Sequence, residues 1–183
     1  MSKLLNDTKV RIDNVRASFE HLLKASAFPG TDDYKFSVSS IIDKSDKESI
    51  KIIETAIKNA EKKGVEKFGD KFANAKDRFN PLQDGDTEKD GDPAYENSLY
   101  INASNRTKPA VLDAKTGLDA EESAIYSGMY GKVVINFFPY FSSAKSCGVS
   151  ASLLGFQKTA DGESLGGARA TESDFEDDDD ILG

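Results

Sequence analysis

The stretch that most constrains the fold covers residues 130–141, the longest run rich in β-branched and aromatic residues in the chain. Successive side chains of a strand point to opposite faces. One face here is apolar and predicts a core side: Val133, Ile135, Phe137 and Phe141. The other mixes a cation, an amide and aromatic rings: Lys132, Val134, Asn136, Phe138 and Tyr140. Such a surface is typical of binding to a charged, flat ligand, and single-stranded nucleic acid is the obvious candidate.

Four further segments have strand patterns, namely residues 8–19, 34–42, 97–107 and 147–158. Five strands in one small domain predict a mainly β fold with inserted helices. We expect a five-stranded antiparallel OB-fold-like barrel, because closure removes exposed strand edges. A sandwich of two sheets would satisfy the same strand count.

A helical insertion is predicted between the second and third strands, at about residues 46–78. Ser45 and Glu48 match a capping box, and Ile50, Ile53 and Ile57 then recur at helical spacing. Gly64 stands where a C-terminal cap is expected. A shorter helical run follows, with one apolar stripe: Val65, Phe68 and Phe72.

Residues 81–96 are rich in Pro, Gly and Asp and predict an exposed acidic loop. Clustered carboxylates invite a calcium interpretation, with Asp86 opening an EF-hand loop. The twelfth position of that loop falls on Asn97, where a bidentate Glu is required. A solvated loop is therefore favoured, and we predict no metal and no cofactor.

The formal net charge of −8 is unevenly distributed. Residues 172–180 contain seven acidic residues, and residues 81–96 contain six against the single Lys89. Elsewhere the chain has 23 Lys and Arg against 19 Asp and Glu. The pattern indicates a mildly basic domain over residues 1–160, with two acidic appendages. From residue 161 to residue 183 the Gly-, Ser- and acid-rich composition predicts a flexible acidic tail.

Several features bear on compartment and chemistry. The single cysteine, Cys147, fits a reducing cytoplasm. No apolar run approaches the ~20 residues of a membrane helix, and the first residues lack the apolar region of a signal peptide. We therefore predict a cytoplasmic protein without membrane contact. His21 is the only histidine and no Gly-rich phosphate loop precedes a helix, so no enzyme is predicted.

The residues that we expect to bind single-stranded nucleic acid are of two kinds. Rings for base stacking are Tyr100, Phe138 and Tyr140, followed by Tyr34, Tyr130 and Phe156. Cations for backbone phosphates are Lys9, Arg11, Lys35, Arg106, Lys132 and Lys158.

The acidic tail carries apolar residues at both ends of its charge run, which a purely solubilising segment does not need. We expect it to compete with phosphates for the basic domain and to anchor in partner proteins. The residues concerned are Asp174, Phe175, Glu176, Asp177, Asp178, Asp179, Asp180, Ile181 and Leu182. An alternative is a non-enzymatic interaction adaptor that uses the acidic segments as its main interface.

Three blocks, residues 126–138, 148–158 and 161–169, resemble a family of phage and prophage single-stranded-DNA-binding proteins. The resemblance implies an OB-fold domain that coats single-stranded DNA during phage replication and recombination, in the bacterial host cytoplasm. It also implies that the acidic tail contacts replication partners, and a homodimer is plausible for such a protein. The chain departs from the family pattern at Phe138-Pro139-Tyr140 and in the acidic loop at 81–96.

Overall fold

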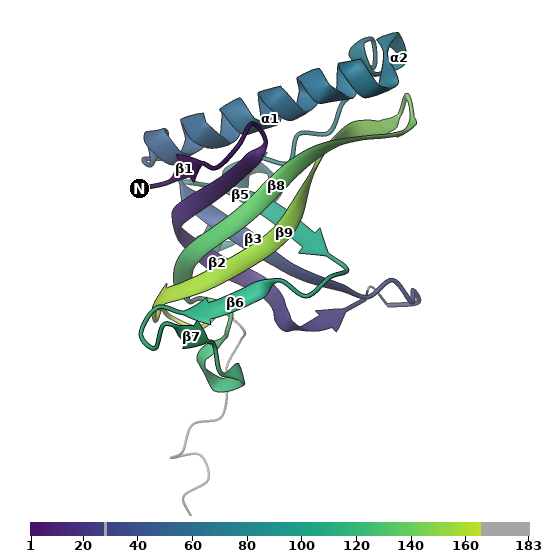
Figure 1. The fold of residues 1–183 in the computed structure, drawn as a ribbon. Helices are drawn as coiled ribbons and strands as arrows, with labels where there is room; N and C mark the ends of the chain where they lie inside the picture. Colours follow the sequence, from purple (N-terminus) through teal and green to yellow (C-terminus); the bar gives the residue numbers. More distant parts are fainter. Residues whose placement is uncertain (28, 166–183) are drawn as a thin grey trace, which may run out of the picture.

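Five long strands form a closed barrel in the computed structural model, which describes residues 1–27 and 29–165 (Figure 1). They are β2 (Lys9–Ser26), β3 (Lys35–Asp43), β5 (Ser98–Asn105), β8 (Tyr130–Ser143) and β9 (Ser146–Ala160). The hydrogen-bonded order is β5-β3-β2-β8-β9, and β5 also pairs with β9, which closes the barrel. The predicted OB-fold-like barrel is confirmed. One detail differs, because the closing pair is parallel, with Ser104 opposite Ser152.

Short elements extend this barrel at its margins. The strands β1 (Lys3–Leu4) and β4 (Gln83–Asp84) pair with β2 and β5, respectively. The strand β6 (Ala110–Asp113) runs parallel to β9 and pairs with β7 (Leu118–Asp119). A single turn of 3-10 helix, η2 (Glu122–Ala124), precedes β8.

The barrel interior follows the period-two pattern of the sequence. Val133, Ile135 and Phe137 of β8 are buried, as predicted for its apolar face, and they join one core with side chains of the other strands. Phe141 lies beyond the barrel and is half-buried against Phe68, with ring centroids 5.9 Å apart. The core is completed by the apolar stripe of α1 (Lys47–Phe68), which includes Ile53 and Ile57.

Both ends of α1 differ in detail from the prediction. Asp46 rather than Ser45 caps the N-terminus, with its carboxylate accepting from the Ser49 amide at 3.1 Å. Gly64 is buried within the helix rather than at its end, and the Phe72 ring packs directly on it. A side chain at position 64 would come within about 2.5 Å of that ring, so glycine is required there. The helix ends at Gly69, whose φ of 74° lies in the left-handed region, and Phe72 then follows in α2 (Asp70–Ala73).

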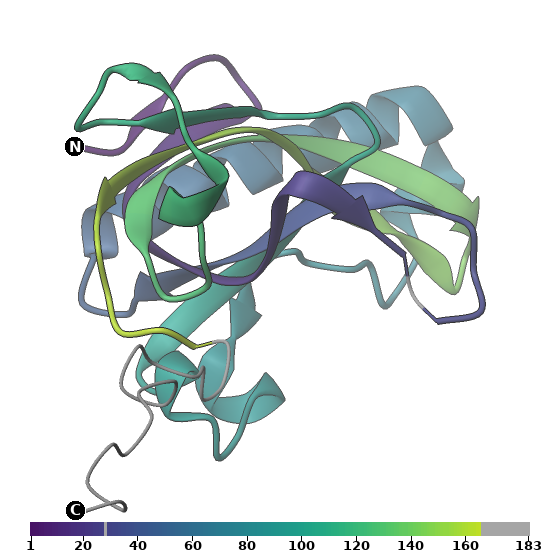
Figure 2. The same ribbon diagram turned by 90° about the horizontal axis from the view of Figure 1, so that it is seen from below.

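The predicted loop at 81–96 is folded onto the barrel rather than wholly exposed. It contains β4, α3 (Gly85–Glu88) and the 3-10 turn η1 (Pro93–Tyr95). Tyr95 is fully buried and its hydroxyl donates to Ser39 Oγ at 3.2 Å. The Lys44 ammonium forms ion pairs with the carboxylates of Asp84 and Asp86, at 2.8 and 2.6 Å. We call residues 85–96 the ridge, which projects from one side of the barrel (Figure 2).

The chain after β9 returns across the outside of the barrel. Arg16 Nη2 donates to the Glu163 carbonyl at 2.7 Å, and the Leu165 amide donates to the Ser127 carbonyl at 2.9 Å. Residues 161–165, here called the strap, are therefore held on the domain, whereas the sequence predicted a flexible tail from Asp161.

The rest of the predicted tail lies outside the described residues. This applies to Asp174, Phe175, Glu176, Asp177, Asp178, Asp179, Asp180, Ile181 and Leu182. Within the part of the chain that is described, no helix is long and apolar enough to cross a membrane.

Candidate nucleic-acid interface

The outer surface of β2, β3 and β5 has a floor of short polar side chains. Cross-strand pairing aligns His21 with Ser37, Ser37 with Ser104, and Ser39 with Asn102. Asn102 is exposed, and Ser37 and Ser104 are half-buried, so their polar groups reach solvent. Hydroxyls and amides of this kind donate to and accept from bases, sugars or phosphates. We call this surface the β2–β3–β5 face.

Phe19 projects from one side of this face. Its side chain is 62% exposed, and its φ of 45° is in the left-handed region, which is a strained conformation for a bulky residue. The cause is a bulge in β2, where the pairing register with β3 shifts between Ser18 and His21. A bulge re-aims a side chain. Strict alternation would place the Phe19 ring in the core with Val15 and Ala17. The bulge instead turns this ring outward.

Lys89 reaches from the ridge to the same place. Its Nζ lies 5.4 Å from the centroid of the Phe19 ring, 5.6 Å from that of Tyr95 and 5.7 Å from that of Tyr100. An ammonium at this distance is attracted by the negative ring faces. The contact fixes the ridge on the barrel and also places a cation beside the exposed ring of Phe19.

Three predicted residues come together at the opposite side of the face. Tyr34 is 60% exposed at the start of β3. Arg106 Nε and Nη2 each lie 3.1 Å from Asp33 Oδ1, and Lys35 Nζ lies 3.6 Å from Asp33 Oδ2. The hydrogen bond from Arg106 holds the pKa of the Asp33 carboxyl below its usual value. Such exposed ion pairs contribute little stability.

Tyr130 marks a third edge of the surface. It is partly exposed and lies opposite Arg16 of β2, whose guanidinium is 5.6 Å from the ring centroid. Arg16 also donates to the carbonyls of Gly128 and Glu163, at 3.3 and 2.7 Å. The strap therefore passes over this pair.

Two of the predicted stacking rings are buried, so their prediction as exposed platforms is wrong. Tyr100 is 5% exposed, because the ridge covers it and the Tyr95 ring meets it edge-on at 5.1 Å. Burial raises the pKa of Tyr100, and the nearby Glu88 adds to the effect. Phe156 is 2% exposed and pairs with Val133 on the inner side of the barrel. Neither ring offers a face to a base.

Two of the predicted phosphate contacts are engaged within the protein. The Lys158 ammonium donates to the Ala124 carbonyl and pairs with Asp161, both at 2.7 Å, and its side chain is largely buried. Arg11 Nε contacts Asp13 at 2.9 Å, while its Nη2 donates to the Met1 carbonyl at 2.8 Å. These cations therefore make contacts within the protein, and their role as phosphate contacts stays a prediction.

The remaining predicted residues lie on another wall of the barrel. Lys132, Phe138 and Tyr140 point outward from β8, and Lys9 is paired with Asn136 of the same strand. Phe138 is exposed, whereas Tyr140 is half-buried and has its pKa raised by burial. We call these four residues the β8 wall. Around the closed barrel, β2 and β3 lie between it and Tyr100 on β5 in one direction, and β9 lies between them in the other.

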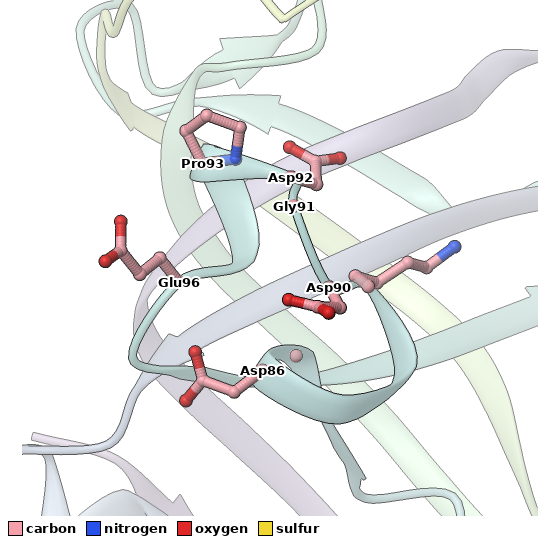
Figure 3. A pocket seen from close by; sticks show the side chains of 8 residues that line it. Asp86, Asp90, Gly91, Asp92, Pro93 and Glu96 are labelled. Atoms are coloured by element: carbon pink, nitrogen blue, oxygen red, sulfur yellow. The ribbon is translucent and has the colours of Figure 1, made fainter.

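The ridge encloses a shallow acidic hollow on its outer side, and Figure 3 shows the carboxylates of Asp86, Asp90, Asp92 and Glu96 around it. Asp86 accepts from Lys44 and from the Asn97 amide, and Asp92 caps η1 by accepting from the Ala94 amide. Pairing with Lys44 lowers the pKa of Asp84 and Asp86. Among residues 1–27 and 29–165, no group of three His, Cys, Asp or Glu side chains is arranged to hold a metal ion.

Comparison with known proteins identifies the family. The family model described as Enterobacter phage Enc34, ssDNA-binding protein, matches residues 8–182. The chain belongs to this family. The family is one of single-stranded-DNA-binding proteins, a non-enzymatic class, so the resemblance seen in the sequence is confirmed.

Individual relatives agree with this assignment. Protein p50 of Acyrthosiphon pisum secondary endosymbiont phage 1 is 36% identical over 177 residues, which is 92% of this chain and 93% of the relative. The bacteriophage Enc34 protein in complex with single-stranded DNA has a TM-score of 0.75 at 24% identity, covering 90% of this chain and 96% of that one. The bacteriophage T7 protein gp2.5 has a TM-score of 0.60 at 16% identity, covering 98% and 97%. The two structures share the fold of this chain.

Proposed function

We propose that this protein binds single-stranded DNA with little regard to sequence and without chemistry, using the β2–β3–β5 face. The observation that carries the proposal is Phe19, an exposed ring held outward by a strained backbone beside a polar floor. Strained residues and bulges concentrate at functional sites. Family membership supports the same ligand. The setting that fits is the bacterial host cytoplasm during phage DNA replication and recombination.

Binding would combine stacking with charge. Bases would stack on Phe19 and Tyr34, since every base has a flat face to offer. Phosphates would meet Lys35, Arg106 and Lys89, and the hydroxyls of the floor would bond to the strand without reading its sequence. Tyr130 and the β8 wall form a second region, where a longer strand could continue.

An oligonucleotide binding assay tests the proposal against the adaptor alternative. We expect a labelled oligo-dT to be retarded by the protein far more strongly than a duplex of equal length. Affinity should fall steeply with salt, because phosphate neutralisation releases counterions. An adaptor would leave the oligonucleotide free, and a flat salt response would contradict the cationic contacts.

We further propose that the acidic tail competes with DNA for this face and recruits replication or recombination proteins. The support is the position of the strap. Leu165, the last described residue, packs against Ile41, Tyr95 and Tyr100 beside the β2–β3–β5 face. The tail therefore leaves the barrel next to the surface for which it would compete, and its acidic residues resemble a run of phosphates in charge.

Deleting residues 172–183 tests the tail. The deletion removes seven carboxylates, so we expect tighter binding of oligo-dT at low salt and a smaller difference at high salt, where charges are screened. Fluorescence anisotropy at two ionic strengths measures both. Equal affinities for the intact and shortened proteins at low salt would contradict the proposal that the tail competes with DNA.

Partner recruitment needs a separate readout. Phage replication proteins should co-purify with the intact protein from infected cells and be lost with the shortened one. A homodimer remains a prediction, and sedimentation equilibrium of the purified protein tests it.

A further inference from the structure

Three charged residues meet at one end of the β2–β3–β5 face. Asp33 lies in the segment that joins β2 to β3, Lys35 is the first residue of β3, and Arg106 directly follows β5. Lys35 is two residues from Ser37 of the floor, and residues two apart in a strand point to the same side. Arg106 is brought to the same place, because both cations pair with Asp33.

The Asp33 carboxylate is held by both cations at once. Arg106 Nε and Nη2 each lie 3.1 Å from its Oδ1, and Lys35 Nζ lies 3.6 Å from its Oδ2. An arginine fork and a lysine ammonium are also the groups with which proteins bind phosphate. The hydrogen bond from Arg106 lowers the pKa of Asp33, so its carboxyl is an anion at neutral pH. The carboxylate thus has the charge and the contacts that a backbone phosphate would have at this position.

These ion pairs are open to solvent. The side chains of Asp33, Lys35 and Arg106 are 47%, 41% and 75% exposed. Exposed ion pairs are weak, and salt screens them further. A strand that stacks a base on the neighbouring Tyr34 would therefore meet two cations that are occupied but only weakly held.

We propose that Asp33 is an internal substitute for phosphate that lowers the affinity for single-stranded DNA and its dependence on salt, an inference that rests on the proposed function. A backbone phosphate has to displace the carboxylate from Lys35 and Arg106. The displaced carboxylate stays close by and repels the phosphate. Two positive charges and one negative charge leave a single net positive charge for the DNA.

Removing the charge of Asp33 tests the proposal. The variant Asp33→Asn keeps the size of the side chain, and we expect it to bind oligo-dT about three- to tenfold more tightly at low salt. The plot of log K against log salt concentration should steepen by about 0.7, the value for one more phosphate neutralised on a single strand. Fluorescence anisotropy measures both quantities. The intact protein and the protein lacking residues 172–183 are both needed, since the acidic tail would also be attracted to the freed cations.

Asp32→Asn is the matched control. Asp32 precedes Asp33, is exposed, and has no ion-pair partner among the residues that the structure describes. The change removes the same charge from the same segment, and it should alter the affinity by about twofold at most, because a solvated charge is screened.

A second comparison uses Arg106→Gln, which should weaken binding. Adding Asp33→Asn to this variant should give a clearly smaller gain than it gives in the unaltered protein, because one of the two cations that Asp33 occupies is absent. Thermal unfolding of each variant shows that the fold is kept.

The sign of the Asp33→Asn effect decides between two roles. If the ion pairs only hold the segment that carries Tyr34, the variant should bind more weakly. Weaker or unchanged binding in both the intact and the shortened protein would overturn the proposal, as would an equal gain for Asp32→Asn. Unchanged affinity for Arg106→Gln would overturn it as well, while leaving single-strand binding intact. If the unaltered protein does not bind oligo-dT, the proposed function itself fails.

Discussion

Replacing Phe19 with alanine is expected to weaken oligo-dT binding roughly 5- to 150-fold, because each stacked base contributes about 1–3 kcal/mol. The ring is exposed, and within residues 1–27 and 29–165 its one cation–ring contact is with Lys89, so little folding free energy depends on it. Fluorescence anisotropy with a labelled oligonucleotide measures the loss, and thermal unfolding shows whether the fold is kept.

Two companion variants make the result specific. Phe19→Tyr retains a flat ring and should keep most of the affinity. Phe79→Ala removes another exposed ring, which lies beside Gly148 at the start of β9 and outside the face. Equal losses for Phe19→Ala and Phe79→Ala would mean that a general loss of aromatic surface, rather than stacking at Phe19, weakens binding.

The second large effect concerns stability. Phe72→Ala is expected to lower the free energy of unfolding by about 3–5 kcal/mol, as for other buried rings. Phe72 is fully buried and lies over Gly64, with its centroid 5.9 Å from that of Phe68 and 5.5 Å from the Arg78 guanidinium carbon. In a domain of this size the Tm should fall by roughly 6–20 °C.

Urea unfolding and calorimetry measure the Phe72 effect. Phe72→Leu should cost less, because it leaves a smaller cavity. Oligo-dT affinity at a temperature where both proteins are folded should be unchanged, since α2 contributes nothing to the β2–β3–β5 face. A loss of affinity in the folded variant would show that α2 takes part in binding.

The parts of the fold that the sequence predicted are those governed by local periodicity. The burial of Val133, Ile135 and Phe137 follows directly from alternation along β8. The apolar stripe of α1 follows from helical spacing in the same way. Strand closure was predictable as well, because a five-stranded sheet without closure leaves edges exposed.

The errors arose where contacts between distant segments decide the outcome. Gly64 looks like a helix cap in sequence, but Phe72 returns to pack on it and makes glycine necessary inside the helix. Tyr100 does lie on the outer face of β5, as alternation predicts. Its burial is due to Tyr95, carried there by a ridge that composition alone presents as a solvated loop.

The proposed site was only partly predictable. Tyr34, Lys35 and Arg106 were candidates in the sequence because rings and cations flanking strands are a recognisable pattern, and β3–β5 pairing brings them to one side of the proposed face. Phe19 was missed because alternation places it in the core with Val15 and Ala17. A reversal of the backbone at one bulged position has no clear signature in a single sequence.

The central claim is that single-stranded DNA lies across the β2–β3–β5 face, and photo-crosslinking tests it most directly. A bromouracil-substituted oligonucleotide would be irradiated on the full-length protein and the crosslinked residues identified by mass spectrometry. We expect crosslinks at Phe19 and Tyr34. Crosslinks at Phe138 and Tyr140 of the β8 wall, with Phe19 and Tyr34 unmarked, would contradict it.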